Sequence, residues 1–352
     1  CKTLAKAGYE VYLIAPHEKE EEVDNVKIVP ISPVKNRIKR ILFQPFRALK
    51  LALRVKARVY HIHDPELILV GVFIKFLSHG KVIYDVHENV KGQIIDKEWI
   101  PFGLHKVVLF LYSIIESLCL RFLDFIIIAE DSYKKLYPNN NRVLSIRNFP
   151  ILNYLNEMDN LLTQDCVNKD IDVIYVGGIS IIRGIFELLN VANILRDLNF
   201  VFIGSISDTL LDKITNFVNM FQLVNVKFLG EVSHRNVYRL ICKAKIGVAI
   251  LHPRANYIES LPTKLFEYMS VGLPVVASNF PLWKDIVEGN ECGICVDPLN
   301  PKEIANAIKY ILDHPDEARK MGENGRKAVL EKYNWEKESE KLLLIYSSLL
   351  RY

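Results

Sequence analysis

The stretch 259–278 carries the residue types of an anion-binding site at the start of a helix. Pro262 suits the first turn of a helix, where its missing N–H costs nothing, and Gly272 suits the position just after a helix end. Free backbone N–H groups and the positive end of the helix dipole bind phosphate at such an N-terminus. Lys264 would add a full positive charge there. Glu267, about one turn later, would accept hydrogen bonds from a ribose diol.

Each of these residues alone also fits an ordinary capped helix with surface charges. The whole run fits it less well, because packing does not require Glu259 and Glu267 to flank a Pro-Thr-Lys segment. The run therefore predicts a phosphate site whose helix must be positioned by the elements around it.

Strands alternate with helices along almost all of the 352 residues, which predicts an α/β protein with parallel sheets. The expected strands are 10–15, 27–30, 59–63, 81–86, 125–129 and 142–146 in a first series, and 172–176, 200–203, 226–229, 246–250, 274–278 and 293–296 in a second. The intervening helical patterns include 184–198, 262–271 and 301–313, and 335–350 forms a late helix. Two such series indicate two Rossmann-like domains. Ligands bind beyond the carboxyl ends of the strands in such folds, so the site is expected in a cleft between the domains.

The predicted organisation is an N-terminal Rossmann-like domain over 1–160 and a C-terminal Rossmann-like domain over 161–335 that carries the expected phosphate site. A last helix over 336–352 would cross back to the first domain. The chain opens in a helical pattern without a Met, and we expect a preceding strand and loop to be missing.

Composition excludes several classes of protein. With 50% hydrophobic and 24% charged residues the chain is not a disordered one, and six scattered Cys do not form a disulfide framework. A net charge of +4 without a clustered recognition motif argues against nucleic acid as a partner. No stretch predicts a transmembrane helix, and the sequence lacks Asn-x-Ser/Thr acceptor sites. We therefore expect a cytoplasmic location.

The spacing Glu259-x7-Glu267, followed by Gly272-x-Pro274, resembles the donor-site motif of family 4 glycosyltransferases, which have the two-domain GT-B fold. The resemblance extends along essentially the whole chain. The other stretches that carry it are 2–16, His61-Ile-His-Asp-Pro-Glu66, Tyr84-Asp-Val-His-Glu88, Asn148-Phe-Pro150 and Tyr175-Val-Gly-Gly178 with Arg183-Gly184.

The resemblance assigns roles residue by residue. It implies that Glu267 binds the nucleotide ribose and that Glu259 contacts the transferred sugar. Arg183 would bind the donor diphosphate, and Lys264 is placed to bind the same diphosphate. His87 would face the donor sugar. The catalytic set is then His87, Arg183, Glu259 and Lys264. The donor-binding set is Gly177, Gly178, Arg183, Glu231, Val232, Leu261, Pro262, Thr263, Lys264 and Glu267, and the acceptor side holds His63, Asp64 and Glu88.

The activity implied by the resemblance is sugar transfer with retention of anomeric configuration, from a UDP- or GDP-linked donor to a saccharide or lipid-linked acceptor. Surface polysaccharide or glycolipid synthesis is the expected setting. Fixed cations would stabilise the charge that develops on the β-phosphate, so we expect neither a metal nor another cofactor. The family usually has Arg where this chain has Gly178. Either Arg183 and Lys264 suffice, or donor turnover is weakened.

Other functions also fit parts of this pattern. A non-hydrolysing nucleotide-sugar epimerase shares the architecture but lacks the paired Glu run. A non-catalytic, donor-binding partner of another transferase would explain Gly178 as lost activity. A Rossmann dehydrogenase fits poorly, because no Gly-x-Gly-x-x-Gly lies between a strand and a helix.

The stretch from Lys35 to Arg58 is basic and apolar together and contains no acidic residue. It predicts contact with an anionic membrane surface, by which the protein would lie peripherally on the inner face of the plasma membrane. The alternative is an ordinary helix with a solvated basic face. The apolar stretch 104–129 could extend the same surface, although we expect a buried helix followed by the strand 125–129.

Three further motifs have the spacing of metal, redox or catalytic sites but are interpreted as structural features or as polar residues at a strand end. His61 and His63 point to one side of a strand, but no third metal ligand follows at a recognisable spacing, so a polar cluster on the acceptor side or simple packing is favoured. Cys292 and Cys295 have redox spacing but lie around a late strand. The Asp170-Ile-Asp172 motif precedes a strand and predicts a turn at the entry to the domain.

Overall fold

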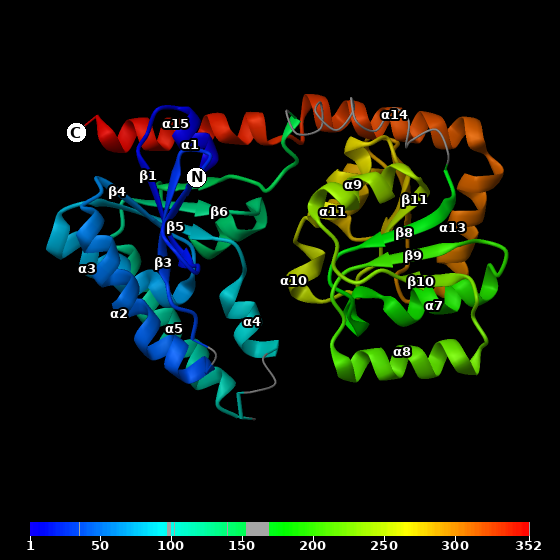
Figure 1. Ribbon diagram of the computed structural model, residues 1–352, viewed down its shortest axis with the longest axis horizontal. Coiled ribbons are helices and arrows are strands. Elements are labelled where there is room, and N and C mark those ends of the chain that lie inside the picture. Colours follow the sequence, from blue (N-terminus) through cyan, green and yellow to red (C-terminus); the bar gives the residue numbers. More distant parts are fainter. Residues whose placement is uncertain (35, 97–99, 102, 139, 153–168, 352) are drawn as a thin grey trace. The chain divides into compact units, whose positions relative to one another are not determined.

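The computed structural model describes the chain except for residues 35, 97–99, 102, 139, 153–168 and 352. It divides into two compact units (Figure 1). The first comprises Cys1–Arg147 and Glu338–Tyr352, and the second comprises Asn148–Lys337. The boundary at 160/161 predicted from the sequence lies outside the described residues. Each unit is an α/β structure built on parallel strands, as predicted.

The first unit holds two sheets, in the orders β1-β3-β2 and β4-β5-β6-β7. All pairs are parallel except β2 with β3, which form an antiparallel hairpin. The strands are β1 (Val11–Pro16), β2 (Glu21–Val23), β3 (Val26–Ile31), β4 (Val59–Ile62), β5 (Lys81–Val86), β6 (Phe125–Ile128) and β7 (Val143–Ser145). The hairpin strand β2 was not predicted, because its acidic residues do not give the apolar pattern that indicates a strand. Asp24 and Asn25 form its two-residue turn with φ of 50° and 62°.

Helices surround these sheets. They are α1 (Lys2–Lys6), α2 (Arg37–Val55), η1 (Pro65–Leu67), α3 (Ile68–Ser78), α4 (Val90–Asp96), α5 (His105–Leu120), η2 (Asp131–Leu136) and the part of α15 (Trp335–Leu350) from Glu338 onward. Val82, Tyr84 and Val86 of β5 pack with Ile126 and Ile128 of β6 in the core of the unit. These strands are buried along nearly their whole length, as their continuous apolar sequences predict.

The prediction of a buried helix within 104–129 is wrong, although the strand that follows it is present as β6. Only Glu116 and Cys119 of α5 are buried. The Glu116 carboxylate forms an ion pair with Lys91 at 2.8 Å and accepts hydrogen bonds from the hydroxyls of Tyr112 and Tyr137. Because these polar contacts occupy the inward face of α5, most of its large apolar side chains lie on the outer face.

The second unit has one parallel sheet in the order β10-β9-β8-β11-β12-β13. Counted along the unit, this is the doubly wound order 3-2-1-4-5-6, whose switch point lies between β8 and β11. The strands are β8 (Ile171–Val176), β9 (Phe200–Ile203), β10 (Val226–Phe228), β11 (Ala244–Ala249), β12 (Val275–Ser278) and β13 (Gly293–Val296). The helices are η3 (Ile181–Arg183), α7 (Ile185–Ile194), α8 (Asp208–Met220), α9 (His234–Cys242), α10 (Ala255–Ile258), α11 (Thr263–Ser270), α12 (Pro281–Val287), α13 (Pro301–Asp313) and α14 (Pro315–Glu331).

No helix in the described part of the chain is long and apolar enough to cross a membrane.

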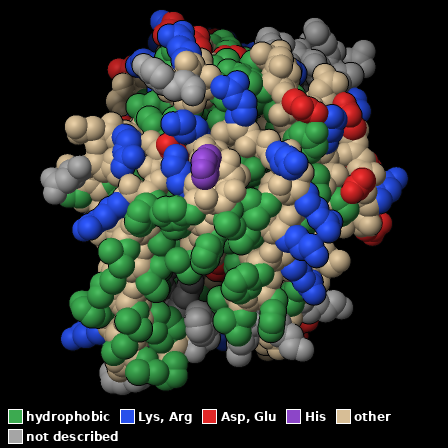
Figure 2. Space-filling view, turned by 90° about the vertical axis from the view of Figure 1, so that its left-hand side faces the viewer, with side chains coloured by type: hydrophobic (Ala, Val, Ile, Leu, Met, Phe, Trp, Pro, Cys, Tyr) green, Lys and Arg blue, Asp and Glu red, His purple; other side chains and the backbone are tan. Residues whose placement is uncertain are grey.

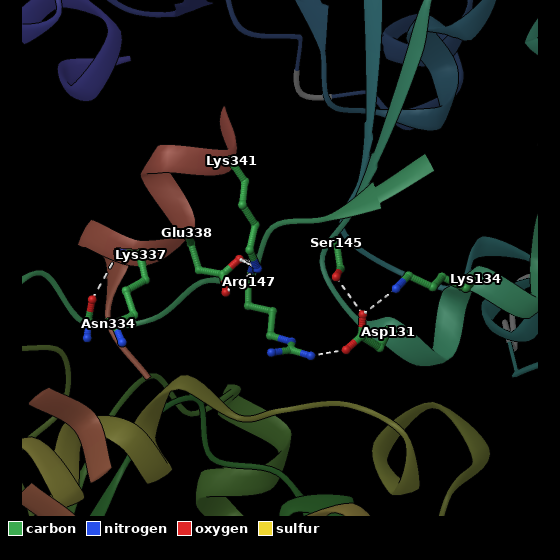
Figure 3. Close-up of polar contacts among 8 residues, drawn as sticks. All are labelled: Asp131, Lys134, Ser145, Arg147, Asn334, Lys337, Glu338 and Lys341. Carbon is green, nitrogen blue, oxygen red and sulfur yellow. Dashed lines mark hydrogen bonds and ion pairs between the residues drawn. The ribbon is translucent and has the colours of Figure 1, made fainter. Parts of the chain in front are cut away.

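The chain enters the second unit after Arg147 and returns to the first within α15. Figure 3 shows the polar contacts at these two points. Asn334 caps the start of α15 by accepting a hydrogen bond from the N–H of Lys337 at 3.1 Å. Glu338, only 3% exposed, accepts hydrogen bonds from the N–H of Arg147 at 3.1 Å and from the Lys341 ammonium at 2.8 Å. Glu338 therefore fixes the last helix to the segment that follows β7 in the first unit.

Replacing Glu338 by Ala should destabilise the first unit by about 1.5–3 kcal/mol, because it removes a buried, charged acceptor from the part-buried N–H of Arg147 and from Lys341. The measurement is urea unfolding followed by circular dichroism. Glu340, exposed on the same helix, is the matched control, and Glu340→Ala should change stability by less than about 0.5 kcal/mol. Equal effects of the two variants would contradict this role for Glu338.

Candidate functional site

The predicted phosphate-binding residues gather at the switch point of the second unit. Gly177 and Gly178 follow β8, and two cationic side chains lie directly over them. A Cβ on Gly177 would lie 3.2 Å from Lys264 Nζ, and one on Gly178 would lie 2.9 Å from Arg183 Nη1. Gly177 also has a backbone φ angle of +120°, which residues other than glycine rarely adopt. The loop therefore brings its backbone close to both cations.

The Lys264 ammonium is buried without a hydrogen-bond acceptor among the described residues. The residue is 8% exposed, and Nζ lies 3.7 Å from the centre of the Tyr175 ring. Burial lowers the pKa of Lys264 well below its usual value, and the charge of Arg183 lowers it further, while Glu267 acts in the opposite direction. A buried cation without an acceptor is costly unless an anion pairs with it. The arrangement therefore suits an anionic ligand.

Helix α11 carries Lys264 in its first turn, as predicted, with one correction at its start. Pro262 is the N-cap residue and not part of the first turn, since its ψ of 125° is extended. The end is as predicted: Gly272 (φ +73°) donates to the carbonyl of Met269, and Leu273 donates to that of Tyr268.

The hydroxyl of Tyr268 fixes α11 to the sheet at the switch point. It accepts from the N–H of Val176, the last residue of β8, at 2.9 Å, and donates to the carbonyl of Val248 on β11 at 3.4 Å. Tyr268 is fully buried. The first turn of α11 is thus held beside the ends of the two strands that diverge there.

Glu267 lies on α11 beside a residue that sequence reasoning missed. Its Oε1 is 3.7 Å from Nε2 of His234, the first residue of α9, and this contact raises the pKa of His234. His234 follows Glu231 and Val232 of the predicted donor-binding set, of which Glu231 is exposed and Val232 is half-buried. The sequence feature that could have identified His234 as a site residue is its position at a helix start, close after Gly-Glu-Val.

The remaining predicted residues lie on the connection between β11 and α11. Glu259 is the C-cap residue directly after α10 and is half-buried, as are Leu261 and Pro262, whereas Thr263 is exposed. The indole N–H of Trp283 donates to the carbonyl of Ser260 at 2.6 Å and anchors this connection.

Sequence reasoning also missed a contact between the β11–α11 connection and helix α7. Nε2 of His252 lies 3.0 Å from Oε1 of Glu187, in the helix that directly follows Arg183-Gly184.

The predicted acceptor-side residues and His87 belong to the first unit, at the carboxyl ends of β4 and β5. His63 Nδ1 lies 3.1 Å from His87 Nε2. Asp64 is the N-cap residue before η1, and Glu88 is exposed. Asp85, which sequence reasoning did not select, joins these rings: its Oδ2 lies 3.1 Å from His61 Nε2 and 3.4 Å from His87 Nε2.

These contacts shift the pKa values of the cluster in different directions. Burial alone would raise the pKa of Asp85, but hydrogen bonds from His61 and His87 hold it well below its usual range. The hydrogen bond to Asp85 raises the pKa of His87. Burial, followed by the charge of His61, lowers the pKa of His63 to about 4. The Asp85 carboxylate is thus the shared partner of the imidazole rings of His61, His63 and His87.

Two motifs set aside earlier occupy structural positions. Burial raises the pKa of both Cys292 and Cys295 to about 12, which does not suit a reactive thiol. Asp172 lies within β8 and not before it, and accepts hydrogen bonds from Asn199 N–H and Lys245 Nζ at 2.8 and 2.7 Å.

Comparison with known proteins identifies two matching families along the chain. Residues 164–328 match the family described as glycosyl transferases group 1, and residues 1–139 match the family described as Glycosyltransferase Family 4. The capsular polysaccharide biosynthesis glycosyltransferase CapM of Staphylococcus aureus is 23% identical over 99% of this chain and 92% of the relative. The spore coat protein SA of Bacillus subtilis is 27% identical over 49% of this chain, and that match spans only about half (48%) of the relative.

Solved structures share the fold. Sucrose-phosphate synthase from Thermosynechococcus elongatus superposes with a TM-score of 0.78 at 20% identity, over 99% of this chain and 91% of that one. Anabaena HepE, solved in complex with UDP and glucose, superposes with a TM-score of 0.68 at 15% identity, over 92% of this chain and 86% of that one. The GT-B fold predicted from the sequence is confirmed by these neighbours.

Replacing Lys264 by Met should stabilise the ligand-free protein by about 1–3 kcal/mol, because a buried cation without an acceptor gives way to an apolar side chain of similar length. The advantage should shrink as the pH rises toward about 10.4, where the unfolded lysine also loses its proton. Thermal unfolding across a pH series measures both effects.

Lys245 is the matched control, because it is paired with Asp172. Lys245→Met should not raise stability. A lower melting temperature for Lys264→Met than for the unmodified protein would contradict the uncompensated burial of Lys264.

Proposed function

Because the chain belongs to the family of group 1 and family 4 glycosyltransferases, we propose that it is a retaining glycosyltransferase. It would move a sugar from a UDP- or GDP-linked donor to a saccharide or lipid-linked acceptor. The setting that we propose is surface polysaccharide or glycolipid synthesis, and the likeness to CapM supports the first of these. HepE, whose structure contains UDP and glucose, supports UDP as the first nucleotide to test.

The buried ammonium of Lys264 is the observation that carries the proposal. It lies beside a glycine loop, close to a second cation, Arg183, and in the first turn of a helix whose free N–H groups also attract anions. Two fixed cations and a helix N-terminus suit a diphosphate better than a single carboxylate. The site lies at the switch point of a doubly wound sheet, where ligands bind in such folds.

The proposed mechanism assigns the diphosphate to Arg183, Lys264 and the start of α11. As the bond between sugar and β-phosphate breaks, negative charge grows on the leaving phosphate. Preorganised cations and N–H dipoles stabilise that charge without reorganisation, and we propose that no metal or other cofactor takes part. The family resemblance assigns retention of configuration to the transfer.

The other predicted residues would bind the remainder of the donor. Glu267 would hold the ribose diol next to His234, and the loop with Glu231 and Val232 would contact the base. Glu259 and His87 would contact the transferred sugar, while His63, Asp64 and Glu88 would form the acceptor side.

The glycine at 178, where the family usually has Arg, fits this assignment. Arg183 Nη1 donates a hydrogen bond to the carbonyl of Gly178 at 3.1 Å and fills the space that a side chain on residue 178 would need. Arg183 therefore takes the place of a cation at 178, which favours an active donor site over a degenerate one.

Nucleotide binding by two variants distinguishes the proposed roles. Lys264→Met should weaken binding of UDP or GDP by about 1.5–3 kcal/mol, and leave binding of uridine or guanosine unchanged, because only the diphosphate meets Lys264. Glu267→Ala should weaken diphosphate and nucleoside by the same factor, because the ribose is common to both. Isothermal titration measures all four affinities.

Lys245→Met and Glu288→Ala, in the same unit, are the controls and should bind normally. Equal loss of nucleoside and diphosphate binding in Lys264→Met would argue against a diphosphate contact. Interconversion of a bound sugar nucleotide without acceptor would identify an epimerase, and tight binding without any transfer would identify a non-catalytic partner.

We further propose that the protein lies on an anionic membrane through helices α2, α3 and α5. Figure 2 shows hydrophobic side chains gathered on the corresponding face, with Lys and Arg beside them. Helix α3 contacts both α2 and α5. The exposed apolar residues on the three helices are Ile41, Leu42, Phe43, Phe46, Leu69, Phe73, Phe76, Leu77, Val107, Phe110, Leu111, Ile114, Ile115 and Leu118. Soluble surfaces rarely expose so large an apolar area without a partner.

The charges on these helices suit anionic lipid. Their sequences contain a single acidic residue, Glu116, and it is buried. Arg40, Arg47, Lys50 and Arg54 of α2 are exposed. Lys35 and the side chains of residues 37–39 lie outside the described part of the chain. The combination of an apolar face and basic residues is typical of a surface that binds at the lipid headgroups.

The double variant Arg47→Glu/Lys50→Glu should bind vesicles of anionic lipid at least about tenfold more weakly, since each basic residue near the surface contributes about 1 kcal/mol. Phe43→Glu/Phe46→Glu should release the protein as well. Co-sedimentation with anionic and zwitterionic vesicles measures both. Met220→Glu on α8, also highly exposed, is the control. Unchanged binding of both double variants would refute this surface.

A further inference from the structure

The carboxyl ends of β4 and β5 bring three metal-ligating side chains together in the first unit. One ligand atom each from His61, His63 and Asp85 lie within 4.8 Å of one another. The strands pair in parallel with His61 opposite Ile83, so alternate residues of both strands project to the same side. His61 on β4 and Asp85 on β5, with His63 and His87 directly after the two strand ends, therefore converge on one side of the sheet.

The distances from Asp85 to both histidines match those around a tetrahedral zinc ion, and the ligand atoms of His61 and His63 lie within 4.8 Å of each other. Ligands about 2.0–2.1 Å from Zn²⁺ lie about 3.3 Å apart from one another. Asp85 Oδ2 is 3.1 Å from His61 Nε2 and 3.5 Å from His63 Nδ1. His87 Nε2 is 3.4 Å from the same oxygen and 3.1 Å from His63 Nδ1. Small movements of these side chains would admit the ion.

The surroundings also resemble those of a metal site. The second ring nitrogen of His61, Nδ1, lies 3.0 Å from the hydroxyl of Tyr346, the kind of outer contact that orients a ligating histidine. The rings of His61 and His63 stack within 9° of parallel. His61 and Asp85 are largely buried, whereas the side chain of His63 is 51% exposed, which leaves a path from solvent.

We propose that His61, His63 and Asp85 form a binding site for Zn²⁺ or a similar late divalent transition metal, with His87 beside its fourth position. Two imidazoles and one carboxylate favour such ions over Mg²⁺ or Ca²⁺, which prefer oxygen ligands. The bound ion would hold His63 and His87 in place. If His87 faces the donor sugar, as in the proposed function, the ion would also inhibit transfer; the binding itself does not depend on that function.

The experiment titrates the metal-free, full chain with Co²⁺ and then displaces it with Zn²⁺. Tetrahedral nitrogen and oxygen coordination gives strong visible absorption, whereas cysteine thiolates add intense near-ultraviolet charge-transfer bands. We expect one Co²⁺ per chain, visible absorption without those bands, and displacement by Zn²⁺ but not by excess Mg²⁺.

Variants assign the ligands. His63→Gln and Asp85→Asn should each lower Zn²⁺ affinity by more than about tenfold, measured by competition with a chromophoric chelator. His63→Gln changes a half-exposed ring and should keep the fold even if Asp85→Asn does not, as judged by circular dichroism. His79→Asn is the matched control: His79 is exposed in the same unit, and Asn tolerates its φ of +59°.

Unchanged Zn²⁺ affinity in folded His63→Gln would overturn the proposal. So would the absence of stoichiometric binding to the unmodified chain, or a cobalt spectrum dominated by thiolate bands. Either of the last two outcomes would leave the cluster as a hydrogen-bond network centred on Asp85.

Discussion

The second unit is organised around a lysine ammonium that is removed from water and has no hydrogen-bond acceptor among the described residues. Such a group opposes folding, so the surrounding structure must hold it in place. Tyr268 does so by joining α11 to the ends of β8 and β11, and the Schellman closure at Gly272 fixes where the same helix ends. Gly177 lets the backbone after β8 approach Lys264 without a side chain between them, and Gly178 does the same for Arg183. The buried ammonium of Lys264 costs free energy in the ligand-free protein. Because a bound anion removes that cost, the free energy of anion binding is larger.

Both units place their polar side chains according to one rule, the convergence of parallel strand ends. In the second unit this rule brings the glycine loop, Arg183 and Lys264 together where β8 and β11 diverge. In the first unit it brings two strands, each with alternating polar residues, into a cluster around Asp85. The chemistry of the two clusters differs because one is dominated by cations and the other by imidazoles with a central carboxylate.

The sequence was informative wherever local pattern determines structure. Continuous apolar runs predicted β9 and β13 to the residue, and Gly272 was placed correctly at the end of α11 because only its conformation closes that helix. Local pattern was less informative where partners are distant in sequence. The third possible metal ligand, Asp85, lies on a neighbouring strand, so no spacing reveals it. The outward apolar face of α5 also follows from distant contacts, since Lys91 and Tyr137 hold Glu116 inward. The position of Lys264 was predictable, but its burial against Tyr175 was not.

Proton uptake on nucleotide binding tests the central claim most directly. Burial lowers the pKa of Lys264 in the free protein, and a bound diphosphate should raise it again, so binding should take up a proton. Calorimetric titration with UDP or GDP in buffers of different ionisation enthalpy, at about pH 8 and about pH 9, measures this uptake while the terminal phosphate, with a pKa of about 6, stays fully ionised. The account predicts net proton uptake on binding that disappears in Lys264→Met. Tight binding without proton uptake at either pH, or uptake that persists in Lys264→Met, would contradict it.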